Sequence, residues 1–464
     1  MARANDRPKG IHRETISMNG DRWLIAWGLG YAAAGASSLL VPLYAVALGA
    51  GPFLVSLLAA TAALAGVPGA LIWGRLADRT GRRRVFVLVA LGAAAVVLAV
   101  LPTIRSVPLL IVTNALLWFV IAAAAPVLTL LVVDGRPVGA WEARIATLNT
   151  YQGYGWVLGL LAGAVWIPAA GRFLAPDVGL QSLFWVAAVA AGLGTVVAWR
   201  WLPPEPQVSA ARVANRPDVI ARLDRGGGRY VRAVPFATTR LYWAIQWLRR
   251  NRLRDHIDRD LQAYLTAVVL FSTGFAAFWA PLPVYLRTAF ANEQVFWLFL
   301  ATNLAAAVFY ERVVDWIARF GPRRLQIGAL GTRAVLFPLV GLVTIPLPLV
   351  LDLPVLLVAF GLIGLTWAVI AVTATGLVTR LAGRSRGQAL GLYTALAGLG
   401  GAVGSLLGGV VASLAGFLAT FVLSAVLVAA GAALVGVQIH LDRRETSPEG
   451  PSKPVVESGT EADE

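Results

Sequence analysis

Gly74-Arg-Leu-Ala-Asp-Arg-Thr-Gly-Arg-Arg-Arg84 separates two apolar runs, one at 52–73 and the other at 85–103. An apolar run of about 20 residues is long enough to cross the hydrocarbon core of a bilayer as an α-helix. Arginines that gather between such runs are typical of the cytoplasmic face of a membrane protein. We therefore expect a cytoplasmic loop between two transmembrane helices at this point.

Apolar runs of similar length recur on both sides of this loop. Of the 464 residues, 58% are hydrophobic and only 14% are charged, a balance unusual for a soluble chain. In lipid the backbone must satisfy its own hydrogen bonds, so each run is expected to be helical. The predicted fold class is all-α integral membrane with twelve transmembrane helices, at 23–48, 52–73, 85–103, 107–133, 145–168, 180–202, 262–287, 294–312, 325–346, 350–379, 387–411 and 415–438.

The distribution of basic residues predicts the orientation. With a cytoplasmic N-terminus, 35 of the 39 Lys and Arg residues fall in cytoplasmic segments and 3 in loops on the outer side. This asymmetry predicts a multi-pass protein of the plasma membrane with both termini in the cytoplasm. The formal charge of +15 does not predict a nucleic-acid partner, because such a protein gathers its basic residues on one soluble face.

One long polar segment divides the chain into two halves. We predict a cytoplasmic N-terminal tail at 1–22, a six-helix bundle at 23–202, a cytoplasmic central loop at 203–259, a second six-helix bundle at 260–438 and a disordered acidic tail at 439–464. Residues 230–253 of the central loop interleave aromatic residues with arginines. That pattern fits either a helix on the inner leaflet or a basic linker that packs on the bundle.

The two halves share short motifs at a common offset, which indicates an internal repeat. Pro42-Leu-Tyr44 corresponds to Pro283-Val-Tyr285, and Gly81-Arg-Arg-Arg84 corresponds to Gly321-Pro-Arg-Arg324. A glycine series recurs as well, in which Gly153, Gly155, Gly159 and Gly163 correspond to Gly398, Gly400, Gly404 and Gly408. The bundles are therefore expected to be pseudo-symmetric.

Residues 74–84 and this architecture together indicate a family. Residues 74–84 are similar to the loop signature Gly-x-Leu-x-Asp-Arg-x-Gly-Arg-Arg of the major facilitator superfamily (MFS), which the chain resembles over nearly its whole length. The resemblance implies the MFS fold, in which two six-helix bundles surround a central cavity that opens alternately to each side. In the second half, Val314 and Ala318 replace the glycine and aspartate of the signature. We therefore assign a functional role only to the first copy.

The resemblance implies a gating role for five residues of the first copy, Gly74, Asp78, Arg79, Gly81 and Arg82. A glycine permits close helix approach or a tight turn, and an aspartate places a negative charge beside a helix end. By resemblance, Asp78 holds the cytoplasmic side shut through Arg386 at the start of a later span. The alternative is that the arginines of this stretch serve only as topology signals.

Uncharged polar residues inside the predicted spans are candidates for the cavity. Such groups must find partners within the membrane. The cavity candidates are Asn114, Asn149, Gln152, Trp156 and Asn303. Interhelical hydrogen bonding explains the amides equally well. Four further aromatic residues, Tyr31, Trp118, Trp279 and Trp367, either shape an apolar cavity or pack.

Glycines at spacings near one helical turn predict close helix packing. The packing glycines are Gly155, Gly159, Gly163, Gly400, Gly404 and Gly408. Their pattern loosely resembles the glycine motif of the family's drug-efflux members, although the Gly-Pro pair of that motif is missing. The resemblance therefore favours efflux only slightly over uptake.

Few charges enter the predicted spans. The chain has no Cys, and its three His residues lie outside the spans, so no cofactor, metal site or membrane-embedded enzyme is predicted. Proton coupling, if present, would use boundary carboxylates such as Asp78, Asp134 or Glu311. Arg333 is the only charge away from the ends of a predicted span, and we predict that it snorkels or forms an ion pair rather than binding an anion.

These observations predict a carrier that moves a small molecule by alternating access. Because the cavity candidates are neutral or aromatic, we expect secondary active efflux of an apolar or amphipathic compound, with lipid handling as a close variant. A facilitator or an uptake carrier on the same fold is the alternative, and a non-transporting sensor is less favoured. The expected partners are a small-molecule substrate, the lipid bilayer and a proton as coupling ion, and the protein is expected to be a monomer.

Overall fold

The computed structural model describes residues 22–80, 82–133, 141–202, 259–343, 349–382 and 386–445, and the regular elements of these residues are all helical. The all-helical class is therefore confirmed. The described residues before the central loop form six α-helices and a short 3-10 helix, η1 (Leu101–Thr103). The α-helices are α1 (Trp23–Ala47), α2 (Pro52–Thr80), α3 (Arg83–Val100), α4 (Val107–Val133), α5 (Trp141–Ala170) and α6 (Pro176–Trp201).

The second half divides its helices differently from the predicted runs. Its helices are α10 (Arg259–Trp279), α11 (Leu282–Leu286), α12 (Asn292–Phe320), α13 (Pro322–Val343), α14 (Leu349–Leu381) and α15 (Arg386–Glu445). The predicted run 262–287 is broken after Trp279, where Pro281 cannot donate a helical hydrogen bond. The predicted runs 387–411 and 415–438 both lie within α15. Gly416, with a φ of 85° and a ψ of 173°, interrupts the regular helix near the start of the second run.

The outer surface of these helices is apolar, as a bilayer requires. In the described part of the chain, nine helices are long and apolar enough to cross a membrane. The apolar stretches described in α2 and α4 are shorter and are not included among the nine. The two predicted runs within α15 are counted as one helix. The protein is thus a multi-pass membrane protein, and its twelve crossings stay a prediction.

Several helices, among them α2 and α15, continue beyond the apolar runs that predicted them. Helix α2 extends to Thr80, so most of the Gly74–Arg84 stretch forms the end of a helix rather than a loop. Helix α15 extends to Glu445, so the tail predicted from residue 439 begins as a helix. Apolar length reports only the part of a helix that lies in lipid, because helical hydrogen bonds continue equally well into the headgroup region.

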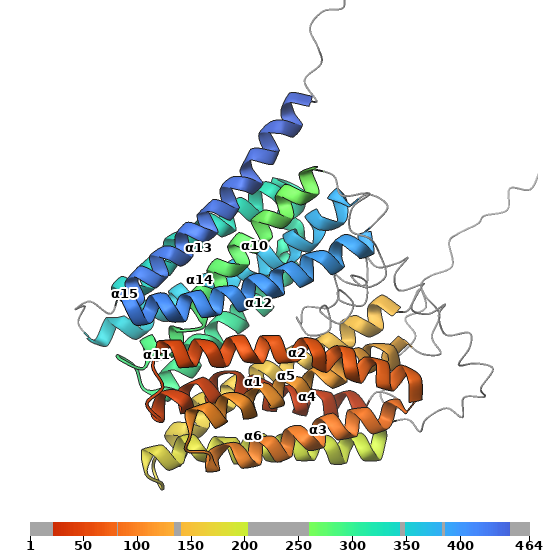
Figure 1. The fold of residues 1–464 in the computed structure, drawn as a ribbon, viewed down its shortest axis with the longest axis vertical. Helices are drawn as coiled ribbons and strands as arrows, with labels where there is room; N and C mark the ends of the chain where they lie inside the picture. The colour runs from red at the N-terminus through yellow and green to blue at the C-terminus, as the bar shows by residue number, and fades with distance from the viewer. Residues whose placement is uncertain are drawn as a thin grey trace, which may run out of the picture.

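Figure 1 shows α1–α6 as one group of helices and α10–α15 as a second group beside it. The repeated tyrosine motif makes the same contact in each group. The hydroxyl of Tyr44 donates to the carbonyls of Pro102 and Ile104 at 3.1 and 2.8 Å. The hydroxyl of Tyr285 donates to the carbonyls of Val340 and Gly341 at 3.0 and 2.9 Å. Tyr44 thereby ties the end of α1 to the segment that follows α3, and Tyr285 ties α11 to the end of α13.

Candidate functional site

The two halves meet near one end of the molecule, which carries the turns 48–51, 171–175 and 287–291 and is called the distal end. A Cβ placed on Gly163 of α5 would lie within 3.0 Å of the Phe296 ring of α12. A Cβ on Gly409 of α15 would lie within 3.0 Å of Ser56 of α2. The contact between α1 and α11 lies at the same end. Close glycine contacts therefore join the halves at the distal end.

The opposite end, called the basic end, carries Arg22, Arg82 and Arg259. In Figure 1 the two groups of helices lie close together near α11 and diverge toward this end. The glycine contacts between the halves fall near the start of α2 and the end of α5, far along each helix from the basic end. The structure is therefore joined at the distal end and spread at the basic end.

Glycines bring α1 and α5 into direct backbone contact within the first half. A Cβ on Gly155 would lie within 3.0 Å of the carbonyl oxygen of Gly28, and one on Gly159 within 3.0 Å of that of Ala32. On the other side of the contact, a Cβ on Gly35 would meet the backbone of Trp156. Because small residues let two backbones approach so closely, the aromatic side chains beside them are drawn together.

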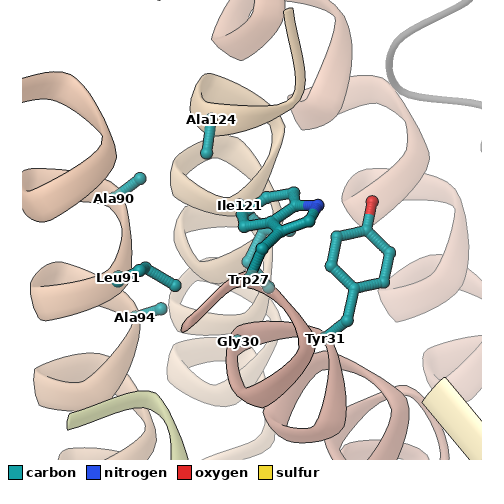
Figure 2. A pocket seen from close by; sticks show the side chains of 8 residues that line it. All are labelled: Trp27, Gly30, Tyr31, Ala90, Leu91, Ala94, Ile121 and Ala124. Carbon is teal, nitrogen blue, oxygen red and sulfur yellow. The ribbon is translucent and has the colours of Figure 1, made fainter. Parts of the chain in front are cut away.

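An aromatic cluster results from this close approach. The ring centroids are 4.8 Å apart for Trp27 and Tyr31, 6.3 Å for Tyr31 and Trp156, and 6.4 Å for Trp156 and Trp118. These four residues, called the aromatic cluster, come from α1, α5 and α4. Three of them were singled out from the sequence and Trp27 was not, although it precedes Tyr31 by one helical turn. Figure 2 shows the indole of Trp27 beside the ring of Tyr31.

The aromatic cluster borders a small apolar pocket between α1, α3 and α4. Side chains of α3 and α4 line it opposite Trp27 and Tyr31, and Figure 2 shows them around the two rings. The indole nitrogen of Trp27 is buried without a hydrogen-bond partner. The lining residues besides Trp27 and Tyr31 are Gly30, Ala90, Leu91, Ala94, Ile121 and Ala124.

Two amides of α5 lie next to the aromatic cluster in the sequence. Gln152 is 2% exposed and its Oε1 has no hydrogen-bond partner, while Nδ2 of Asn149 is buried and likewise unpartnered. Residues three apart on a helix lie on the same side, and Trp156 follows one turn later. The helix therefore presents an unsatisfied acceptor and an unsatisfied donor close to aromatic rings.

The other amide candidates do not join this group. Asn114 is buried, its Nδ2 donates to the carbonyl of Leu58 at 3.4 Å between α4 and α2, and its Oδ1 has no hydrogen-bond partner. Asn303 donates to the carbonyl of Phe299 in its own helix at 2.8 Å. For Asn303 the geometry favours hydrogen bonding within its helix over lining a cavity, whereas Asn114 links α4 to α2 and keeps one free acceptor.

Most of the predicted packing glycines make the contacts that their spacing indicates. Gly404 and Gly408 approach the α10 backbone at Thr273 and Ala277 as closely as Gly155 and Gly159 approach α1, and a Cβ on Gly400 would lie 3.0 Å from the carbonyl oxygen of Val269. Gly163 differs from the others, because it contacts the opposite half. The sequence pattern alone does not distinguish these two uses of a glycine.

The proposed gate lies largely outside the described residues. The backbones of Gly74, Asp78 and Arg79 belong to α2 and that of Arg386 begins α15, but their side-chain positions are not described, and neither is Gly81. Arg82 is exposed, immediately before α3. The ion pair between Asp78 and Arg386 therefore stays a prediction.

Arg333 does not behave as predicted. It is 1% exposed, its Nε donates to Oγ1 of Thr366 at 2.9 Å and its Nη2 donates to the carbonyl of Ile363 at 2.9 Å. Its Cζ lies 4.4 Å from the ring centroid of Phe275 and 5.5 Å from that of Trp367. The prediction of snorkelling or an ion pair is thus wrong, because the side chain turns inward among uncharged groups. In the described residues no carboxylate contacts it.

Comparisons with known proteins agree with this architecture. The sequence profile of the Major Facilitator Superfamily matches residues 23–323 and 264–461. No curated protein matches the chain. Among solved structures, the nucleoside transporter NupG is similar with a TM-score of 0.63 at 11% identity, covering 91% of this chain and 98% of its own.

Two further structures share the fold. The xylose transporter XylE from E. coli, in a partially occluded inward open conformation, matches with a TM-score of 0.59 at 14% identity, covering 95% of this chain and 100% of its own. The human organic anion transporter MFSD10 matches with a TM-score of 0.54 at 18% identity, covering 90% and 98%. Identities this low establish the fold alone. With the profile match over most of its length, the chain belongs to the Major Facilitator Superfamily and is an alternating-access transporter rather than an enzyme.

Proposed function

We propose that this protein exports a small amphipathic organic compound across the plasma membrane by secondary active transport. The observation that carries the proposal is the aromatic cluster together with the unpartnered amide atoms of Asn149 and Gln152. An aromatic ring or short apolar body would pack against the cluster. A polar group of the solute would satisfy the free acceptor and donor, which are costly to leave unpaired inside a membrane.

The proposed orientation places the basic end and both termini in the cytoplasm, in line with the arginine distribution. With that orientation the present structure is inward-facing, since the halves are joined at the distal end. Opening the distal end would separate Gly163 from Phe296 and Gly409 from Ser56. In that state the basic end would close, with Asp78 and Arg386 as the proposed pair. Such a rigid-body exchange of contacts is a common form of switching.

Coupling to a proton would use carboxylates at the ends of helices. Glu311 and Asp315 of α12 are exposed near the basic end. Asp78 and Asp134 are the other candidates from the sequence. Exchange of a proton for a solute needs a titratable group whose protonation changes when the solute binds. These carboxylates are therefore the proposed sites of proton coupling.

The binding part of the proposal is tested with purified protein and a panel of neutral aromatic amphiphiles, including 1-naphthamide. We expect at least one compound to raise the melting temperature, because a ligand that binds only the folded state stabilises it. Gln152→Met and Trp156→Ala should each remove the shift. Gln181→Met is the matched control, because it removes an amide from α6, outside the cluster. No shift with any compound, or shifts that survive both substitutions, would contradict the proposed site.

The direction and coupling are tested in proteoliposomes loaded with the best-binding compound. Secondary active efflux predicts uphill movement driven by an opposing pH gradient. Flux that only dissipates the solute gradient would instead identify a facilitator. Movement of solute and protons in the same direction would identify an uptake carrier.

A further inference from the structure

The most unusual group in the second half is the guanidinium of Arg333, in the middle of α13. A charged side chain at this depth is costly unless it is paired or faces a cavity. Two of its nitrogens are held by neutral acceptors on α14, the hydroxyl of Thr366 and the carbonyl of Ile363. The third, Nη1, is buried and has no hydrogen-bond partner. The positive charge is thus positioned by hydrogen bonds and remains uncompensated within the described residues.

Two aromatic rings cover the guanidinium. Phe275 of α10 and Trp367 of α14 lie 4.4 and 5.5 Å from Cζ, and their ring centroids are 6.4 Å apart. A guanidinium at this range is attracted to the ring faces. That attraction stabilises the cation partially, but a ring supplies neither a full negative charge nor an acceptor for the N–H groups of Nη1.

Trp367 lies on the side of α14 that faces α10, where its ring centroid is 6.4 Å from that of Phe275. Its side chain is 42% exposed, and Val358 of the same helix is 65% exposed. The two residues are nine positions apart, and a rotation of about 100° per residue places them on opposite sides of the helix. The exposed indole of Trp367 therefore lies on the opposite side of α14 from Val358, beside Phe275, where it covers Arg333.

We propose that Arg333, Phe275 and Trp367 form a binding subsite for the carboxylate of an amphipathic organic acid. This inference rests on the proposed function and narrows its substrate class. The carboxylate would accept hydrogen bonds from Nη1 and would neutralise the guanidinium in a low-dielectric environment, where charge-assisted hydrogen bonds are strong. A change in the side-chain torsions of Trp367 would open the path from the interior. The apolar body of the acid would then pack against the indole.

The two occupied nitrogens explain why an arginine suits this subsite. They fix the plane of the guanidinium, so the N–H groups of Nη1 point in a constant direction before the acid arrives. A lysine offers one ammonium on a flexible stem and would not keep both contacts with α14. We therefore expect Arg333→Lys to lose most of the preference for carboxylates although it retains the charge.

The test uses three matched pairs of probes, benzoate with benzamide, 1-naphthoate with 1-naphthamide, and indole-3-acetate with its amide. Binding of radiolabelled probes to the purified full-length protein is measured by equilibrium dialysis at neutral pH. In at least one pair, we expect the carboxylate to bind about tenfold or more tightly than the amide, as is typical of a hydrogen bond to a charged group. Arg333→Gln should abolish this preference, so that the carboxylate and the amide of a pair bind with similar affinity.

Arg312→Gln is the matched control. Arg312 is an exposed arginine of α12, and its guanidinium lies 5.5 Å from the ring of Phe309, so the control also removes a cation beside an aromatic ring. The carboxylate preference should persist in it. If Arg333→Gln fails to fold, Trp367→Ala replaces it, since this exposed residue can be truncated with less disruption. We expect that variant to lose at least half of the preference.

The outcomes separate this inference from the proposed function. If no pair shows a carboxylate preference, or if the preference survives both Arg333→Gln and Trp367→Ala, the anion subsite is wrong. If the neutral amides still bind in a Gln152-dependent way, the proposed function stands without it. If neither class of probe binds, both proposals fail.

Discussion

Substitution of Gly163 by alanine tests whether the distal contact holds the present conformation. The new Cβ would lie within 3.0 Å of the Phe296 ring, and that ring is fully buried, so it has little room to move. Carbon atoms normally lie about 3.5 to 4.0 Å apart. Overpacking of this kind costs about 1 to 3 kcal/mol. The cost applies only while the halves are joined at the distal end, because the ring belongs to the other half.

The penalty translates directly into a population shift. A difference of about 1 to 3 kcal/mol changes the ratio of the distally open to the distally joined state by about 5-fold to about 150-fold. Alanine also raises helix propensity relative to glycine by up to about 1 kcal/mol. That effect is the same in both conformations and cancels from the ratio. We therefore expect Gly163→Ala to populate the distally open, outward-facing state.

The chain has no cysteine, so two introduced cysteines can be labelled selectively. Spin labels at Gly51→Cys and Ala289→Cys would report the distance between the halves at the distal end by pulsed electron paramagnetic resonance. We expect Gly163→Ala to increase the long-distance population. Gly153→Ala is the control, because this glycine lies on the same helix and a Cβ there has no neighbour within 4 Å. An unchanged distribution, or an equal change in the control, would refute the reasoning.

Three further predictions address packing and gating. Gly404→Ala should lower the free energy of unfolding by about 1 to 3 kcal/mol relative to Gly401→Ala in detergent titrations, because only the former meets the α10 backbone; equal stabilities would contradict this. Tyr285→Phe should lower the free energy of unfolding in the same titrations by about 0.5 to 1.5 kcal/mol, because two carbonyls lose their donor, and a neutral effect would count against it. Asp78→Asn should impair transport in proteoliposomes without affecting membrane insertion, and full wild-type flux would remove the gate assignment.

Sequence reasoning was most successful for features that the bilayer itself imposes. A long apolar run in lipid must be helical, so the helices and their order could be predicted from the positions of the apolar runs. The internal repeat could also be recognised from the sequence, because Tyr44 and Tyr285 lie in matching motifs. In the structure these two tyrosines make matching hydrogen bonds. The family followed from the Gly74–Arg84 stretch and agrees with the profile match.

Reasoning from the sequence was weaker where a residue has several possible neighbours. Asn114, Gln152 and Asn303 look alike as amides within apolar runs, yet Asn303 donates within its own helix, Asn114 donates to another helix, and both Asn114 and Gln152 keep an unpartnered oxygen. The inward direction of the Arg333 side chain was missed because a charged residue within a membrane helix usually extends its side chain toward the lipid headgroups. Trp27 was missed because an aromatic residue in a membrane helix gives no signal of its own.

The sequence by itself determined that this protein crosses a membrane as a duplicated bundle of helices, because hydrogen bonding in lipid depends on the local chain alone. Only the tertiary structure decided which glycines join helices within a half and which join the two halves. It also decided that Oε1 of Gln152 is left without a hydrogen-bond partner and that Arg333 is enclosed by Phe275 and Trp367. These outcomes depend on how helices distant in sequence rotate and pack against each other, and no local pattern specifies that rotation.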